Sequence, residues 1–252
     1  MAGGHPPLRV LITGGTAGIG LGIARAFHAQ GAFVTVMGRD AQRAEAVVAA
    51  FDDPDRVRAV SGDVADEGDR ARALQVAVDV FGGLDVLVNN AGTTVRAKPE
   101  DYTPDDYARV LEVNLTSAFA LSQMAFPYLR DSRRGRIINI ASLTSFFGSA
   151  FSLPYAVSKG GIVQLTKSLA LAWGGDGITV NAIAPGWIDT DLTVATRQYV
   201  PELEQNVIKR TPLGRWGTPE DIGGVAAFLA SAEASFVNGT VITVDGGYSA
   251  SL

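Results

Sequence analysis

Residues 13–20 read TGGTAGIG, and the organisation of the whole chain can be worked out from this stretch. A short apolar run, residues 8–13, leads into it, and a helical pattern follows through residue 29. Glycine lets the backbone turn tightly and approach a pyrophosphate, while the N-terminus of the following helix offers free N–H groups and a positive dipole. A glycine-rich turn alone is often only a tight loop. Directly after a first strand and before a helix, it predicts a dinucleotide-binding site.

Beyond this turn, short apolar runs alternate with longer helical patterns. The expected strands are residues 8–13, 33–37, 56–60, 84–88, 136–141, 178–184 and 241–244. The expected helices after the first are residues 41–51, 66–81, 104–129, 154–174 and 219–230. Almost wholly apolar strands that alternate with helices indicate a parallel sheet buried on both faces. The sequence therefore predicts the α/β class: a single-domain, doubly wound parallel sheet (Rossmann fold) of about seven strands with helices on both faces.

The length of 252 residues suits one large α/β domain that spans residues 1–252. Only residues 187–216 lack a clear pattern, and they follow the strand expected at residues 178–184. Ligands of open α/β sheets bind beyond the carboxyl ends of the strands. We therefore expect residues 187–216 to form a substrate lid.

The composition argues against several classes of function. The chain has no Cys and only two His residues, His5 and His28, so disulfides, thiolate catalysis, a His-centred triad and a metal site are not expected. A net charge of −5 and the lack of a long basic tract argue against partners such as nucleic acids and anionic membranes. No apolar run approaches the length of a membrane span, and residues 1–7 do not read as a secretory leader. We expect a soluble, cytoplasmic protein.

The stretch PYAVSK at residues 154–159 brings together two side chains that can move a proton. If Pro154 opens a helix, Tyr155 and Lys159 are four residues apart and share one face. A neighbouring ammonium favours the phenolate and should lower the pKa of Tyr155 from its usual value of about 10. Ser142 directly follows the strand at residues 136–141, with its hydroxyl available to hold a carbonyl oxygen. By itself, such a Tyr–Lys pair is more often an ordinary contact on a helix surface.

Two further polar segments follow expected strands. Asp63 and Val64 follow the third strand, and residues 89–92, NNAG, follow the fourth. Asp, Asn and Gly are common in simple turns. At the carboxyl ends of parallel strands, however, these residues should line the same ligand-binding crevice.

The end of the second expected strand bears on the choice of cofactor. A carboxylate there would accept a hydrogen bond from the ribose 2′-OH and so select NAD(H). Gly38 stands in its place, and Arg39 is suited to pair with a 2′-phosphate. The sequence therefore favours NADP(H) over NAD(H). NAD(H) stays open, since Arg39 could instead stack on the adenine or face solvent, and Asp40 lies close by.

Taken together, these residues resemble the short-chain dehydrogenase/reductase family. Residues 181–186 and 212–217 look most like the branch of 3-oxoacyl-ACP reductases and of gluconate or 2-keto-3-deoxygluconate dehydrogenases. The likeness to the family as a whole runs from Thr13 to Gly247. It rests on the order and spacing of TGxxxGxG at residues 13–20, NNAG at residues 89–92, Asn114, Ser142, the YxxxK pair, Pro185-Gly186 and Thr190.

The resemblance implies a role for each catalytic candidate. Tyr155 would be the general acid/base that protonates the alkoxide formed when hydride reaches a carbonyl. Lys159 would hold the nicotinamide ribose and lower the pKa of Tyr155, while Ser142 would bind the substrate oxygen. Asn114 would support a water between Lys159 and solvent, which requires its helix to be locally irregular. These four residues argue against the alternative of another class, a regulatory nucleotide-binding protein without turnover.

The resemblance also implies the remaining contacts. Asp63 would receive the adenine amino group, and Ile188 and Thr190 would fix the carboxamide. The full set of expected cofactor residues is Gly14, Thr16, Gly18, Ile19, Gly20, Arg39, Asp63, Val64, Asn90, Ala91, Gly92, Tyr155, Lys159, Pro185, Gly186, Ile188 and Thr190. The expected substrate residues are Thr94, Ser142, Thr144, Tyr155 and Trp187. The resemblance further implies a homotetramer, and a sugar acid or a 3-oxoacyl compound as substrate, which the sequence does not separate.

Overall fold

A computed structural model describes residues 6–200 and 202–250, and its centre is a seven-stranded parallel sheet in the order β3-β2-β1-β4-β5-β6-β7. The strands are β1 (Arg9–Thr13), β2 (Phe33–Gly38), β3 (Val57–Ser61), β4 (Val86–Asn89), β5 (Arg136–Ile140), β6 (Thr179–Pro185) and β7 (Val241–Val244). Each expected strand is present, with both ends within two residues of the expected position.

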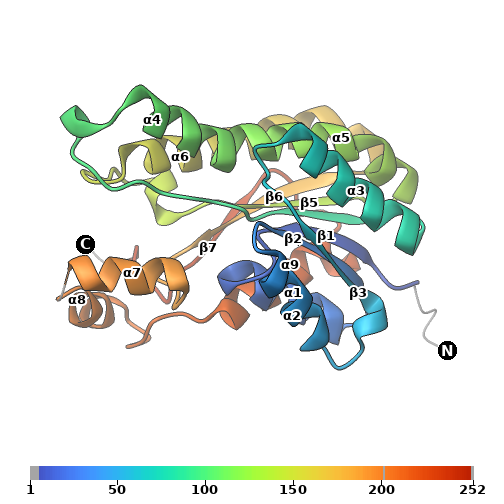
Figure 1. Cartoon of the computed structure of the whole chain (residues 1–252), viewed down its shortest axis with the longest axis horizontal. Coiled ribbons are helices and arrows are strands. Elements are labelled where there is room, and N and C mark those ends of the chain that lie inside the picture. Colours follow the sequence, from blue (N-terminus) through green and yellow to red (C-terminus); the bar gives the residue numbers. More distant parts are fainter. Residues whose placement is uncertain (1–5, 201, 251–252) are drawn as a thin grey trace.

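Helices cover both faces of this sheet (Figure 1). One face carries α3 (Glu67–Phe81), α5 (Ser117–Ser132) and α6 (Leu153–Trp173), with α4 (Pro104–Leu111) beside α6. The other carries α1 (Gly18–Ala29), α2 (Ala41–Ala49) and α9 (Pro219–Ala230). The predicted fold class is therefore confirmed. Among the residues that the structure describes, no helix has the length and apolar character needed to cross a membrane.

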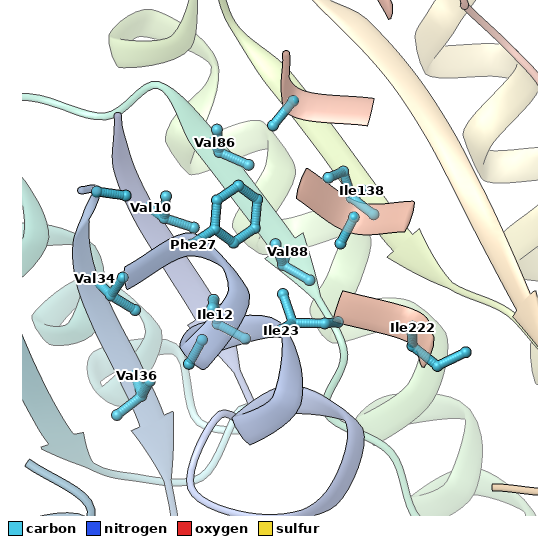
Figure 2. Packing of buried hydrophobic residues seen from close by; sticks show 14 of the residues in the cluster. Val10, Ile12, Ile23, Phe27, Val34, Val36, Val86, Val88, Ile138 and Ile222 are labelled. Atoms are coloured by element: carbon cyan, nitrogen blue, oxygen red, sulfur yellow. The ribbon is translucent and has the colours of Figure 1, made fainter. Parts of the chain in front are cut away.

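The strands are almost continuously apolar because alternate side chains point to opposite faces and both faces are covered. Figure 2 shows the side that faces α1, where Phe27 and Ile23 pack on valines and isoleucines of four strands and on Ile222 of α9. The intervening residues, among them Leu11 and Leu87, are buried in a second core against α3 and α5.

The strand order reverses between β1 and β4, and this places the glycine-rich turn beside the NNAG segment. From β1 the chain proceeds to β2 and β3 on one side, whereas β4 pairs with the opposite side of β1. Asn90 links the two segments, because its Nδ2 donates to the carbonyls of Thr13 and Gly14 at 2.9 and 3.0 Å. Such a reversal is where ligands bind in open α/β sheets.

In two parts of the chain, the helices differ from those that the sequence predicted. The helix expected at residues 104–129 is divided by a π-helical segment, Glu112–Thr116, so the irregularity expected around Asn114 is confirmed. Within residues 187–216 lie two helices that were not predicted, α7 (Asp191–Tyr199) and α8 (Leu203–Arg210). At nine and eight residues, each is too short for a clear helical period to show in the sequence.

Candidate active site

A groove crosses the carboxyl ends of the central strands and consists of two adjoining hollows of about 390 and 430 Å³. The first contains Ser142, Tyr155 and Lys159, and the second contains Asp63 and Thr16. Both are lined by Gly14, Ala17, Arg39, Arg43, Ala91 and Gly92, so they form one continuous groove. We refer to the two hollows as the catalytic end and the distal end.

Most of the predicted cofactor residues line this groove. They are Gly14, Thr16, Gly18, Ile19, Arg39, Asp63, Val64, Asn90, Ala91, Gly92, Tyr155, Lys159, Pro185, Gly186, Ile188 and Thr190. Gly20 does not line it but is needed to shape it, since a Cβ at this position would lie 2.2 Å from the carbonyl oxygen of Gly14. Gly14 itself has a φ of +63°, which favours glycine.

Three of the predicted substrate residues lie away from the lining of the groove. Thr94 and Thr144 have hydroxyl oxygens that are buried and find no hydrogen-bond partner among the described residues. Trp187 lines a neighbouring cavity of about 130 Å³ that shares only Ile188 with the groove, and its ring centroid lies 5.6 Å from that of Trp216. Only Ser142 and Tyr155 of the predicted substrate set therefore line the catalytic end.

The N-terminus of α1 faces the groove without a side-chain cap. Ala17 occupies the N-cap and its side chain accepts no hydrogen bond. The first N–H groups of a helix have no partner within the helix and attract anions. Together with the glycines, this geometry fits a bound pyrophosphate.

Helix α6 places Tyr155 and Lys159 at the catalytic end of the groove. Lys159 is buried, and its Nζ donates to the Ile140 carbonyl at 2.6 Å, at the end of β5. The Nζ atom lies 5.7 Å from the centroid of the Tyr155 ring. Burial of the ammonium lowers the pKa of Lys159 to about 8.

The protonation of Tyr155 differs from what the sequence predicted. Burial raises the pKa of Tyr155 above its usual value of 10, and a hydrogen bond with Ser142 only partly offsets this rise. The prediction that Lys159 lowers this pKa is therefore wrong in this structure. The reason is that burial desolvates the phenol, and this effect outweighs the hydrogen bond with Ser142.

Ser142 begins the short 3₁₀ turn Leu143–Ser145 that follows β5. Its Oγ accepts from the Thr144 backbone N–H at 3.2 Å. A hydroxyl that accepts in this way keeps its own hydrogen to donate. The side chain is thus held at the rim of the groove beside Tyr155, with which its hydroxyl also forms a hydrogen bond.

Asn114 lies behind the groove, buried in the π-helical segment. Its Nδ2 donates to the Thr93 carbonyl at 2.9 Å and to Ser158 Oγ at 3.0 Å, and its Oδ1 accepts from Thr93 N–H at 2.8 Å. Ser158 Oγ in turn donates to the Tyr155 carbonyl at 2.7 Å. Asn114 therefore joins the segment after β4 to the helix that carries Tyr155.

At the distal end, Asp63 is held as a carboxylate by two donors. Its Oδ1 accepts from Ala65 N–H at 3.0 Å and its Oδ2 from Arg109 Nη2 at 2.6 Å. Burial by itself would raise the pKa of Asp63, but these hydrogen bonds and the nearby arginines lower it overall.

Sequence reasoning missed several residues of the groove. Arg109 is contributed by α4, 46 residues from Asp63, so no local pattern indicates it. Arg43 had a signal that could have been used, since it lies four residues after Arg39 at the start of α2. The other lining residues that were missed are Ala17, Met37, Gly62, Thr93, Val113, Ile140, Ala141, Asp191 and Thr193.

Comparison with known proteins assigns the class of this site. Residues 14–249 match a family model described as enoyl-(acyl carrier protein) reductase. The chain is 38% identical to the D-beta-hydroxybutyrate dehydrogenase of Cupriavidus necator, covering 94% of this chain and 96% of that one. It is 39% identical to the 2-dehydro-3-deoxy-D-gluconate 5-dehydrogenase of Bacillus subtilis, covering 94% and 93%. The crystal structure of a short chain dehydrogenase from Bacillus anthracis superposes with a TM-score of 0.85 over 95% of both chains at 34% identity.

The fold and these matches define an oxidoreductase that acts on CH–OH groups, interconverting secondary alcohols and ketones. More specifically, the chain belongs to the short-chain dehydrogenase/reductase family, as its motifs predicted. Membership implies a nicotinamide nucleotide as cofactor. The glycine-rich turn, the uncapped N-terminus of α1 and the two adjoining hollows of the groove fit such a molecule.

Proposed function

We propose that this enzyme transfers a hydride between NADP(H) and a secondary alcohol or ketone, with Tyr155 as the general acid/base. The observation that carries the proposal is the convergence of Ser142, Tyr155 and Lys159 at one end of a groove that the glycine-rich turn also lines. The nicotinamide supplies or receives the hydride when it is bound.

The protein's own residues supply the remaining steps. Ser142 turns its hydroxyl hydrogen from Tyr155 to the substrate oxygen and fixes the position of that oxygen, while its Oγ keeps the hydrogen bond from the Thr144 N–H. Tyr155 gives its proton to that oxygen during reduction and takes it back during oxidation. Because its pKa is raised, Tyr155 carries the proton at neutral pH, as reduction requires.

Lys159 and Asn114 support this proton transfer. An ammonium has three donors, so Lys159 can keep its bond to the Ile140 carbonyl and still hold the ribose hydroxyls. A Cβ placed on Gly92 would lie 3.6 Å from Asn114 Oδ1 and 3.8 Å from Lys159 Nζ. Glycine at position 92 thus leaves space near both polar groups, which suits a water that connects Lys159 to solvent.

Three features of the distal end support a preference for NADP(H). A Cβ on Gly38 would lie 2.3 Å from Thr16 Oγ1, so a carboxylate at position 38 would require Thr16 to move. Asp40 accepts from Arg43 N–H at 3.0 Å as the N-cap of α2, which gives this carboxylate a structural task. Arg39 lines the groove, and its exposed side chain makes no ion pair with the described residues.

The replacement Arg39→Ala tests this preference. We expect the affinity for NADPH to fall about tenfold or more, since hydrogen bonds to a charged phosphate are among the stronger ones. The affinity for NADH should change much less, because NADH lacks the 2′-phosphate. Fluorescence titration with each cofactor measures both values. Equal losses for the two cofactors would contradict a role of Arg39 at the 2′-phosphate.

For the substrate, we propose a sugar acid or a 3-oxoacyl compound. The relatives named above act on a deoxy sugar acid and on a 3-hydroxy acid whose oxidation product is a 3-oxo acid. Residues 187–216, with α7 and α8, border the catalytic end through Ile188, Thr190 and Thr193, which supports their proposed role as a lid. A screen of NADPH and NADH oxidation over ketones, keto sugar acids and 3-oxoacyl thioesters tests activity, cofactor and substrate class together. No turnover with any of these carbonyl compounds would contradict the proposed substrate classes.

We also propose that the chain assembles as a homotetramer in the cytoplasm. Large apolar side chains are exposed on the isolated chain, among them Phe119, Leu171 and Phe236. Burial of such side chains between subunits is favourable. Light scattering of the purified enzyme should give about four times the chain mass of 26.3 kDa. A mass of one chain would contradict the proposed assembly.

A further inference from the structure

Arg43 is a second arginine at the distal end, and its place in the fold sets it apart from surface arginines. It lies in the first turn of α2 and lines both hollows of the groove, as Arg39 does. Its Nη1 lies 3.3 Å from Asp191 Oδ2. Asp191 is the first residue of α7, within the proposed lid, and it also lines the groove.

The Arg43–Asp191 ion pair is exposed, with 50% and 83% of the two side chains accessible to solvent. Exposed pairs of this kind contribute little to stability. The other acids near Arg43 already have partners: Asp63 pairs with Arg109, and Asp40 caps α2. Asp191 is therefore a carboxylate from the lid that a stronger anion can replace at Arg43.

We propose that Arg43 is the second cation of the site for the 2′-phosphate, and that the phosphate displaces Asp191 from it. This inference rests on the proposed preference for NADP(H). A phosphate group carries more charge than a carboxylate and pairs with the arginine fork in the same bidentate manner. Binding of the 2′-phosphate then breaks the contact between α2 and α7. Asp191 thus competes with the cofactor for Arg43, and binding of the adenosine end of the cofactor is coupled to the lid.

The competition predicts opposite effects for the two partners of the ion pair. The probes are adenosine 2′,5′-bisphosphate, which carries the 2′-phosphate, and 5′-AMP, which does not. Isothermal titration should show that Arg43→Ala weakens binding of the bisphosphate about tenfold, the usual range for a lost charge-assisted hydrogen bond. Asp191→Asn should strengthen it by about threefold to tenfold, because a competing carboxylate next to the phosphate is removed. Neither variant should alter binding of 5′-AMP.

Arg25→Ala is a matched control. Arg25 and Glu220 also form an exposed ion pair, at 3.7 Å and with 57% and 61% of the side chains accessible, and neither residue lines the groove. Its loss should leave the affinity for both nucleotides unchanged.

The possible outcomes separate this inference from the proposed function. The inference is overturned if Arg43→Ala leaves the affinity for the bisphosphate unchanged, or if Asp191→Asn lowers the affinity for both nucleotides. The ion pair would then be only a structural contact. If the unmodified enzyme binds the bisphosphate no more tightly than 5′-AMP, the proposed preference for NADP(H) fails, and the inference fails with it.

Discussion

The replacement Tyr155→Phe should lower kcat by about 10²–10⁴-fold, the usual contribution of general acid/base catalysis. Phenylalanine keeps the ring and removes only the hydroxyl that would give its proton to the substrate oxygen. The ring of Tyr155 packs within the fold, whereas its hydroxyl takes part in the chemistry. The fold and the groove should therefore be preserved in the variant. Steady-state kinetics with the substrate found by the screen measure the effect.

Two measurements make this prediction specific. The affinity for NADPH should stay within a few-fold of the unmodified value, since Lys159 and the glycine-rich turn are untouched. The control Tyr107→Phe removes the same hydroxyl from a partly exposed tyrosine of α4 outside the groove and should leave kcat unchanged. Turnover of Tyr155→Phe near that of the control would rule out Tyr155 as the proton donor.

The sequence predicted those features that depend on residues close together in the chain. The glycine-rich turn spans eight residues and the Tyr155–Lys159 pair spans five, so their spacing alone fixes the geometry once the strand and the helix form. The strands could be recognised because a parallel sheet covered on both faces requires unbroken apolar runs.

Features that depend on distant residues or on burial could not be predicted. Arg43 meets Asp191 across 148 positions of sequence, and Arg109 meets Asp63 across 46. The pKa of Tyr155 illustrates the effect of burial. The spacing correctly placed a cation on the same helix face, but desolvation of the phenol, which spacing does not reveal, dominates the pKa.

The role of Asp85 could not be predicted either, because this buried charge lies within an apolar run and its partners are distant in the sequence. Asp85 precedes β4 at the amino ends of the strands, opposite the groove, and its side chain is fully buried. Its carboxylate accepts two hydrogen bonds from the side chain of Arg9 at 2.9 and 2.8 Å, and one from Ser132 Oγ at 2.7 Å. The Arg9 backbone N–H and the Arg134 guanidinium add three more, at 2.9 to 3.2 Å. One carboxylate thus ties together the starts of β1, β4 and β5.

The replacement Asp85→Asn should destabilise the enzyme by about 3 kcal/mol, the lower end of the range for breaking a buried ion pair. The lower end applies because Arg9 and Arg134 are partly exposed and can regain water. For a chain of this size, that loss lowers Tm by roughly 6–12 °C. Asp131→Asn is the matched control, since Asp131 is 75% exposed and pairs with Arg130 at 3.5 Å. The control should change Tm by about 2 °C or less.

The pH dependence of stability tests whether the lost charge of Asp85 causes the destabilisation of Asp85→Asn. Burial alone would raise the pKa of Asp85, but the hydrogen bonds from Arg9, Ser132 and Arg134 lower it from 3.8 to about 2. A carboxylate whose pKa is lower in the folded state stabilises the fold fully above pH 3.8, and this contribution, about 2 kcal/mol, is lost as the pH falls toward 2. The difference in unfolding free energy between the unmodified enzyme and Asp85→Asn should therefore narrow over this interval. Denaturant unfolding at several pH values measures it, and a difference that stays constant down to pH 2 would show that lost packing, not lost charge, destabilises the variant.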